Sequence, residues 1–345
     1  MLGAPVGAAA QSALAYTFDA QSKDVTIIDM ATNANIATKP LGAAVKWLSN
    51  EQDCFDGRLA WTYEDLPDGA VDVIAIDLQE MRVVRRLRAG RGPAHSVILT
   101  PDKRRAIINV AGDDMLVVVE TRTATIAAQV PVGKFPCDLD RTADGRMAYF
   151  PERDQDTVAA IDLQTLQEVR RVPIGEGTRP HMLRLFPDGR TVWVQNAREN
   201  TNVILDAQTL DKLATITVGK VPVTNAFTPD GRFGYITHFE DNFVSVVDTR
   251  SFKEVSRIKV AQGLAVITFR PDGKFAYVAA KDSQAVGVID VAQQELDRLI
   301  PAGKQPWGLS YHLSADSPIP PLAGYPFCRG KKGDPPHPTG VRRAR

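Results

Sequence analysis

Short runs of apolar residues alternate along the chain with turn residues. A typical run, Val244–Asp248, reads VSVVD, which is too apolar for a strand with one face in water and fits a strand packed between neighbouring sheets. Runs of this length, rich in Val, Ile and Tyr and divided by Asp, Gly and Pro, indicate β-strands. Since no helical period of useful length appears, the pattern predicts an all-β chain.

One unit of strands and turns recurs over most of the chain. It contains a Gly, a Pro, an apolar run, a Pro-Asp-Gly turn, an aromatic strand and a Val/Ile run that ends in an acidic residue. The acidic ends recur every 42 to 48 residues, at Asp29, Asp77, Glu120, Asp162, Asp206, Asp248 and Asp290. Asp-Gly is typical of hairpin turns because Gly adopts the positive φ that such turns require. Four strands in about 42 residues is the repeat length of a propeller blade.

The two ends of the repeat region predict how the ring closes. The chain begins in the middle of a unit, with strands expected at Ala13–Asp19, Val25–Asp29 and Asn35–Leu41, and ends with a lone first strand at Pro306–His312. Together they complete one blade, so we expect a single seven-bladed β-propeller over residues 13–312 with four antiparallel strands per blade. Closure of this kind removes exposed sheet edges. The other blades are expected at 42–88, 89–132, 133–174, 175–217, 218–259 and 260–301.

Two terminal segments fall outside the repeats. Residues 1–12 end in small residues like an export cleavage site, without a basic region or a full apolar core. They are interpreted either as a clipped export signal, which predicts a periplasmic or secreted protein, or as a disordered tail, which leaves the protein in the cytoplasm. Residues 313–345 are rich in Pro, Gly and basic side chains, which predicts a disordered tail.

Composition excludes several classes of function. Lys plus Arg and Asp plus Glu both number 41, so there is no net charge to favour nucleic acid as a partner. No apolar stretch reaches 18 residues, so no membrane span is expected. The three cysteines, Cys54, Cys137 and Cys328, form no CxxC motif and no disulfide scaffold. We expect a monomer.

Propeller geometry selects two positions per blade that converge on one mouth of the central channel. The first position, on the channel-lining strand, lies seven residues before the turn Asp. We call this set the inner ring: His95, Cys137, His181, Val223 and Ala265, with Trp307 as the match in the closing strand and Lys46 or Ser49 as candidates in the 42–88 blade. The second position, at the end of the next strand, lies eight residues after that Asp. We call this set the outer ring: Glu64, Val110, Glu152, Asn196, His238 and Ala280, with Asp19 as the match in the first blade.

The two rings bring several metal-ligating residue types to one mouth. His95, Cys137, His181 and His238 offer nitrogen and sulfur ligands suited to copper, zinc or a haem iron. Glu152 and Asn196 are candidates to support those ligands. The competing interpretation is a solvated channel mouth that holds no ion, because no short-range ligand motif is present.

Units such as KVPVTNAFTPDGRFGYITHFEDNFVSVVDTRSFKEVSRIKV resemble YVTN-type repeats, and residues 13–312 resemble YncE-like propellers of that family. The resemblance implies a binding or scaffold protein that holds an unidentified protein or small-molecule ligand at one channel mouth.

Two short motifs are similar to those of cytochrome d1-haem propeller domains, in which a Pro-His at a blade start and a Ser/Thr-His at the next strand end stand over the haem. Here they are Arg179-Pro180-His181 and Thr237-His238-Phe239, with Gly92-Pro93-Ala94-His95 a looser match. This second resemblance implies a haem- or metal-binding redox or cofactor-handling protein that uses His95, His181 and His238. Its two histidines belong to one blade in that family and to successive blades here.

A third hypothesis is a lactonase or lyase at the channel mouth. Asp19, Glu64 and Glu152 would hold a divalent cation, and His238 would act as general base. Scattered turn acids without catalytic function are the competing interpretation.

Overall fold

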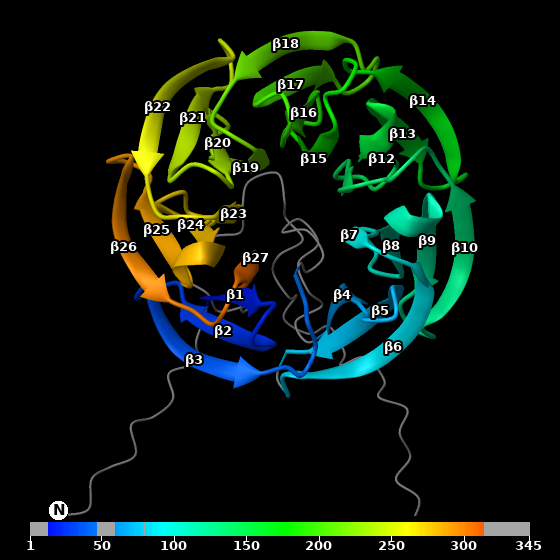
Figure 1. Ribbon diagram of the computed structural model, residues 1–345, viewed down its shortest axis with the longest axis horizontal. Coiled ribbons are helices and arrows are strands. Elements are labelled where there is room, and N and C mark those ends of the chain that lie inside the picture. The colour runs from blue at the N-terminus through cyan, green and yellow to red at the C-terminus, as the bar shows by residue number, and fades with distance from the viewer. Residues whose placement is uncertain (1–12, 47–58, 79, 314–345) are drawn as a thin grey trace, which may run out of the picture.

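The computed structural model describes residues 13–46, 59–78 and 80–313, and these form seven antiparallel β-sheets arranged in a ring (Figure 1). The protein is a seven-bladed β-propeller, as predicted. The segment 1–12 and the tail from residue 314 lie outside the described residues, so the predictions made for them do too.

The predicted closure of the ring is confirmed. The C-terminal strand β27 pairs antiparallel with the N-terminal strand β1, in a register that runs from Ala13 opposite Leu313 to Asp19 opposite Pro306. The order in this blade is β27, β1, β2, β3. The four strands are β27 (Pro306–Leu313), β1 (Ala13–Asp19), β2 (Asp24–Asp29) and β3 (Ala34–Pro40).

The remaining blades follow in chain order. The second blade shows three described strands, and residues 47–58 before them lie outside the described part. Its strands are β4 (Leu59–Asp65), β5 (Ala70–Asp77) and β6 (Arg82–Arg91). The third blade has β7 (Ala94–Leu99), β8 (Arg105–Val110), β9 (Met115–Glu120) and β10 (Thr125–Pro131). The fourth has β11 (Asp140–Arg141), β12 (Met147–Glu152), β13 (Thr157–Asp162) and β14 (Gln167–Pro173).

Three more blades complete the ring. The fifth has β15 (Pro180–Leu185), β16 (Thr191–Asn196), β17 (Thr201–Asp206) and β18 (Lys212–Thr217). The sixth has β19 (Pro222–Phe227), β20 (Phe233–His238), β21 (Phe243–Asp248) and β22 (Lys253–Lys259). The seventh has β23 (Leu264–Phe269), β24 (Phe275–Ala280), β25 (Ala285–Asp290) and β26 (Glu295–Pro301). Short 3-10 turns follow three second strands: η2 (Ala111–Asp113), η3 (Arg153–Gln155) and η4 (Lys281–Ser283). Among the described residues there is no helix long and apolar enough to cross a membrane.

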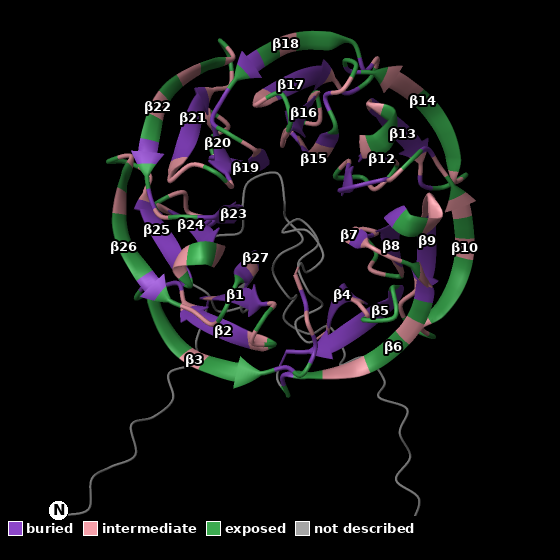
Figure 2. Cartoon of the chain, in the orientation of Figure 1, coloured by how far each residue is buried: buried purple, intermediate pink, exposed green. Residues whose placement is uncertain are grey.

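The core lies between neighbouring blades. The two middle strands of each blade are buried, whereas the outermost strands carry exposed residues around the rim (Figure 2). One apolar cluster joins Tyr235 and Val246 of the sixth blade to Ile267 and Val278 of the seventh. Each blade therefore buries its faces against both neighbours, which explains strands as apolar as Val244–Asp248.

The repeated polar landmarks build turns. Gly189 and Gly231 adopt φ of +75° and +68° in their Asp-Gly turns. At the end of the third strand, Asp206 accepts backbone N–H bonds from Gln208 and Thr209, each at 2.8 Å. These contacts fix the tight turn into the exposed strand.

Bulges in the innermost strands orient the channel-facing side chains. The pairing register shifts at Ala94/Val97 in β7, at Pro180/Met182 in β15 and at Pro222/Asn225 in β19. A bulge adds a residue to one strand and redirects its side chain. His95 and His181 both lie inside such bulges.

Candidate functional site

The outer ring lies at the ends of second strands, and its polar atoms are largely used by the fold. Glu152 is fully buried and accepts a hydrogen bond from the Gly133 N–H at 2.7 Å and one from the Thr157 hydroxyl at 2.6 Å. Arg171 pairs with the same carboxylate at 2.8 Å. Glu152 therefore holds the entry loop of its own blade, and its support for a bound ion stays a prediction.

His238 makes the equivalent contacts in the sixth blade. Its Nε2 accepts a hydrogen bond from the Gly219 N–H at 3.1 Å, and its Nδ1 donates to the carbonyl of Phe243 at 3.1 Å. Both ring nitrogens are thus occupied within the blade, and the side chain is fully buried. The structure does not bring His238 to the other three predicted ligands, because the fold uses its nitrogens to fix the loop before β19.

Glu64 and Asn196 also use polar atoms for hydrogen bonds within the fold. Glu64 accepts from the Ala44 N–H at 3.0 Å and from Arg86 at 2.7 Å. Asn196 donates to the Thr201 hydroxyl at 3.2 Å. The contacts of Glu64, Glu152 and His238 favour a structural role over the catalytic one considered from sequence.

Asp19 differs in its protonation. It is buried and accepts a hydrogen bond from the Thr26 hydroxyl at 2.8 Å, while its Oδ1 has no hydrogen-bond partner among the described residues. Burial raises the pKa of Asp19 to about 6.

The glycine that opens several repeats makes room for the outer-ring side chain. A Cβ added at Gly133 would lie 2.5 Å from the Glu152 carboxyl, and one at Gly219 would lie 2.8 Å from the His238 ring. At Gly303 the distance to Asp19 would be 2.6 Å. A side chain at these positions would displace the acceptor that the loop needs, so glycine and the outer-ring residue act as a pair.

Three inner-ring residues from successive blades form one cluster. The ligand atoms of His95, Cys137 and His181 all lie within 4.8 Å of one another. The two imidazole rings meet edge to face, with centroids 5.3 Å apart. Cys137 is a free, fully buried thiol, and both histidines are partly buried.

Buried hydrogen bonds fix the three strand segments relative to one another. Asn109 accepts from the backbone N–H groups of His95 and Ser96, at 3.1 and 2.7 Å, and its own amide donates to the carbonyl of Cys137. Asp138 accepts from the Leu183 N–H at 3.2 Å and from Arg184 at 2.6 Å. The third, fourth and fifth blades are therefore locked together at the cluster.

The electrostatic environment keeps all three groups uncharged. Burial, the neighbouring imidazole and nearby cations hold the pKa of His95 well below its usual range. Burial, together with Arg153 and Arg179, lowers the pKa of His181 to about 4. Burial raises the pKa of the Cys137 thiol. Neutral imidazoles keep a lone pair available to bind a metal ion at neutral pH.

The other inner-ring positions that the structure describes add no further His, Cys or acidic ligand to the cluster. Val223 and Ala265 are buried apolar residues, and Trp307 packs edge to face on Phe239 at 5.2 Å. Lys46 lies 3.4 Å from Asp65, and Ser49 falls outside the described residues.

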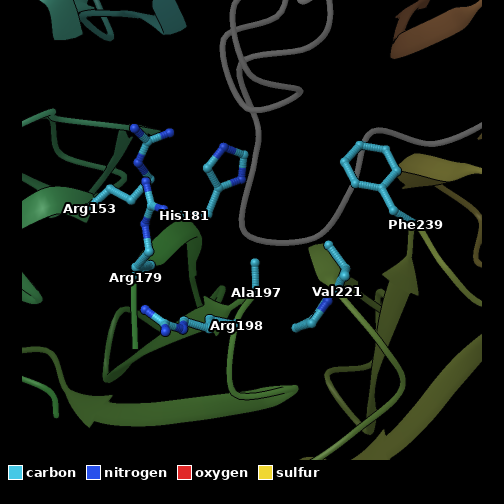
Figure 3. Close-up of a pocket in the computed structure, with 8 residues that line it drawn as sticks. Arg153, Arg179, His181, Ala197, Arg198, Val221 and Phe239 are labelled. Carbon is cyan, nitrogen blue, oxygen red and sulfur yellow. The ribbon is translucent and has the colours of Figure 1, made fainter. Parts of the chain in front are cut away.

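A cavity of about 420 Å³ opens beside the cluster. His181 lies on one side of it with Arg153 and Arg179, and Phe239 lies opposite (Figure 3). The cavity is also lined by Ala197, Arg198, Val221 and Pro222. It thus combines three guanidinium groups with an aromatic ring.

The sequence analysis did not assign Arg153, Arg198 or Phe239 to a binding site. Arg153 follows Glu152, Arg198 follows Asn196 by two positions, and Phe239 follows His238. The repeat spacing carries a signal for them, because the residues just after each outer-ring position lie at the same mouth.

Comparisons with known proteins support the fold. No family model matches the chain, and no curated protein matches it. Solved structures with a similar fold include hydrazine synthase of Kuenenia stuttgartiensis, at 17% identity and a TM-score of 0.67, covering 77% of this chain and 89% of that one. Dihydro-haem d1 dehydrogenase NirN in complex with DHE is 18% identical, with a TM-score of 0.66, covering 90% and 77% of the two chains.

A third similar structure is a putative 6-phosphogluconolactonase of Bacteroides fragilis. It is 14% identical, with a TM-score of 0.73, covering 88% of this chain and 99% of that one. At these identities the likeness is one of fold. None of the three is named a YVTN-repeat protein, so that finer resemblance stays a prediction from the repeats.

Proposed function

We propose that the protein binds a small anionic ligand at one mouth of its channel, and that Arg153, Arg179 and Arg198 recognise the negative group. The carrying observation is the cavity of about 420 Å³ with three arginines and a facing aromatic ring. That volume lies within the range of sites for small organic molecules.

The arginines differ in how far they are neutralised. Arg153 and Arg179 both contact Asp154, at 2.9 and 3.1 Å. Arg198 is exposed and has no acidic partner within 4.0 Å among the described residues. The residues that line the cavity include three guanidinium groups and no carboxylate, and Asp154 pairs with two of the three, so the lining itself carries a positive charge. Guanidinium groups bind carboxylates and phosphates through paired hydrogen bonds.

The apolar wall defines the other half of the ligand. Phe239 packs on Trp307 at 5.2 Å, and the Lys281 ammonium lies 5.5 Å from its ring centroid. The ring is held in place from outside the cavity and offers a flat surface. The arrangement fits a carboxylate or phosphate attached to a planar or apolar body. NirN, a protein of similar fold, was solved in complex with DHE.

A charged and neutral ligand pair tests the proposal. Calorimetric titration compares 2-naphthoate with its uncharged amide, 2-naphthamide, and with inorganic phosphate. We expect the carboxylate to bind more tightly than the amide, and its affinity to fall with added salt because the contacts are electrostatic. Arg198→Ala should weaken the carboxylate about tenfold, which corresponds to about 1.4 kcal/mol.

The matched control is Arg190→Ala. Arg190 is exposed, lies in the same blade and precedes β16, so it lies at the opposite end of that strand from Arg198. It should leave binding unchanged. Equal affinity for 2-naphthoate and 2-naphthamide would overturn the proposal. An equal loss of 2-naphthoate affinity in Arg198→Ala and Arg190→Ala would overturn it too.

A further inference from the structure

We infer that His95, Cys137 and His181 form a binding site for one Cu(I) ion on the channel wall, beside the anion cavity. The inference goes beyond the proposed function, because it needs no organic ligand. It rests on three potential ligand atoms that lie within 4.8 Å of one another and come from three successive blades. One thiolate with two imidazoles is a donor set that favours soft and borderline ions such as copper.

The geometry needs only a small contraction to hold an ion. Metal bonds of about 2.0–2.3 Å place three ligand atoms of a trigonal site about 3.5–4 Å apart. The three ligand atoms lie within 4.8 Å of one another, and side-chain rotations would bring them to that shorter spacing. The backbone can stay fixed, since Asn109 and Asp138 already lock the three strand segments.

One buried polar atom of the cluster, His95 Nε2, has no hydrogen-bond partner among the described residues. Buried polar groups nearly always have partners, so this atom needs an explanation. A bound ion would take the imidazole lone pair.

The donor set decides between Cu(I) and a divalent ion. Arg153 and Arg179 act on Cys137, and so do Asp138 and Asp154, so cations and carboxylates offset one another around the site. Binding replaces the thiol proton of Cys137 with the ion, and that proton leaves to solvent. A soft thiolate and three ligand atoms suit Cu(I), whereas structural Zn²⁺ sites take four ligands.

The test measures Cu(I) binding without oxygen, with the full chain in a Cys54→Ser/Cys328→Ser background that removes the other thiols. Bicinchoninate serves as a coloured competitor for Cu(I). We expect one copper per chain, and at least tenfold weaker binding in Cys137→Ser and in His95→Ala. X-ray absorption should show one sulfur and two nitrogen neighbours.

The matched control is His238→Gln, because that histidine makes contacts only within its own blade. Its copper affinity should equal that of the background protein, and thermal denaturation shows whether each variant is folded. Copper bound equally by Cys137→Ser, or copper with nitrogen and oxygen neighbours only, would overturn the inference. No binding to the folded background protein would overturn it too.

Failure here is distinguishable from failure of the proposed function. Arg198 lines the cavity and is not one of the three ligands, whereas Cys137 is a ligand and does not line the cavity. Arg198→Ala should therefore keep its copper, and Cys137→Ser should keep its affinity for 2-naphthoate.

Discussion

The inner and outer rings carry similar residues and use them in opposite ways. In the outer ring, Glu152 and His238 spend their polar atoms on backbone N–H groups of their own blades. In the inner ring, His95 keeps a buried nitrogen without a partner among the described residues, and its ring centroid lies 5.3 Å from that of His181. The difference teaches that the same residue type can fix a loop in one place and leave an atom available to a ligand in another.

The largest difference in stability between the two rings is expected when an outer-ring carboxylate is removed. Glu152→Ala leaves the Gly133 N–H and Arg171 without their acceptor, and we expect a loss of about 2–3 kcal/mol in the free energy of unfolding. His181→Ala, in the inner ring, should cost less than about 1 kcal/mol. Urea denaturation of both variants compares them. Equal losses would contradict the division into a structural and a free ring.

Removal of the outer-ring histidine should have the next largest effect. His238→Ala leaves the Gly219 N–H and the Phe243 carbonyl unpaired, which should cost about 1–3 kcal/mol. His95→Ala should cost less, because its Nε2 has no bond to lose. Chemical denaturation measures both. A more stable His238→Ala than His95→Ala would reverse the assignment.

A double-mutant cycle tests whether Gly219 and His238 depend on each other for stability. Gly219→Ala places a Cβ 2.8 Å from the His238 ring and should cost about 1–3 kcal/mol through overpacking. In Gly219→Ala/His238→Ala the clash with the ring is relieved, although the Cβ still lies 2.7 Å from Asp241 Oδ2, so the double variant should lose less than the sum of the single losses. The three unfolding free energies decide this, and strict additivity would show that the two residues do not act as a pair.

The smallest expected effect concerns pH. The pKa of Asp19 is about 6 in the folded protein, above the ordinary 3.8. The folded state therefore binds this proton first, and the contribution of Asp19 to stability rises as pH falls from about 7 toward 4. Asp19→Asn removes that contribution, so its stability should rise less than that of the wild type on going from pH 7.5 to pH 5. Denaturation curves at both pH values test this, and identical pH dependence would contradict it.

Counting from the turn Asp placed the outer ring near the ends of second strands and most of the inner ring in first strands, because most blades repeat the same spacing of turn and strand. Cys137 lies just before β11, and the count was ambiguous in the 42–88 blade. Counting could not tell which polar atoms the fold already satisfies. His238 and His181 look alike in sequence, yet one accepts from Gly219 and the other lies in a bulge facing the channel. The glycine that opens a repeat was the available signal, because its missing side chain makes room for the outer-ring acceptor.

The sequence by itself determined the all-β class, the seven-fold repeat and the closure of the ring by β27 and β1, because hairpin turns and strand periodicity are local properties of the chain. The repeat spacing also predicted that His95, Cys137, His181 and His238 meet at one channel mouth. Only the tertiary structure decided that the ligand atoms of the first three lie within 4.8 Å of one another, while the ring nitrogens of His238 make contacts within its own blade. These details depend on bulges in the inner strands and on bonds from Asn109 and Asp138 between blades, which no local pattern encodes.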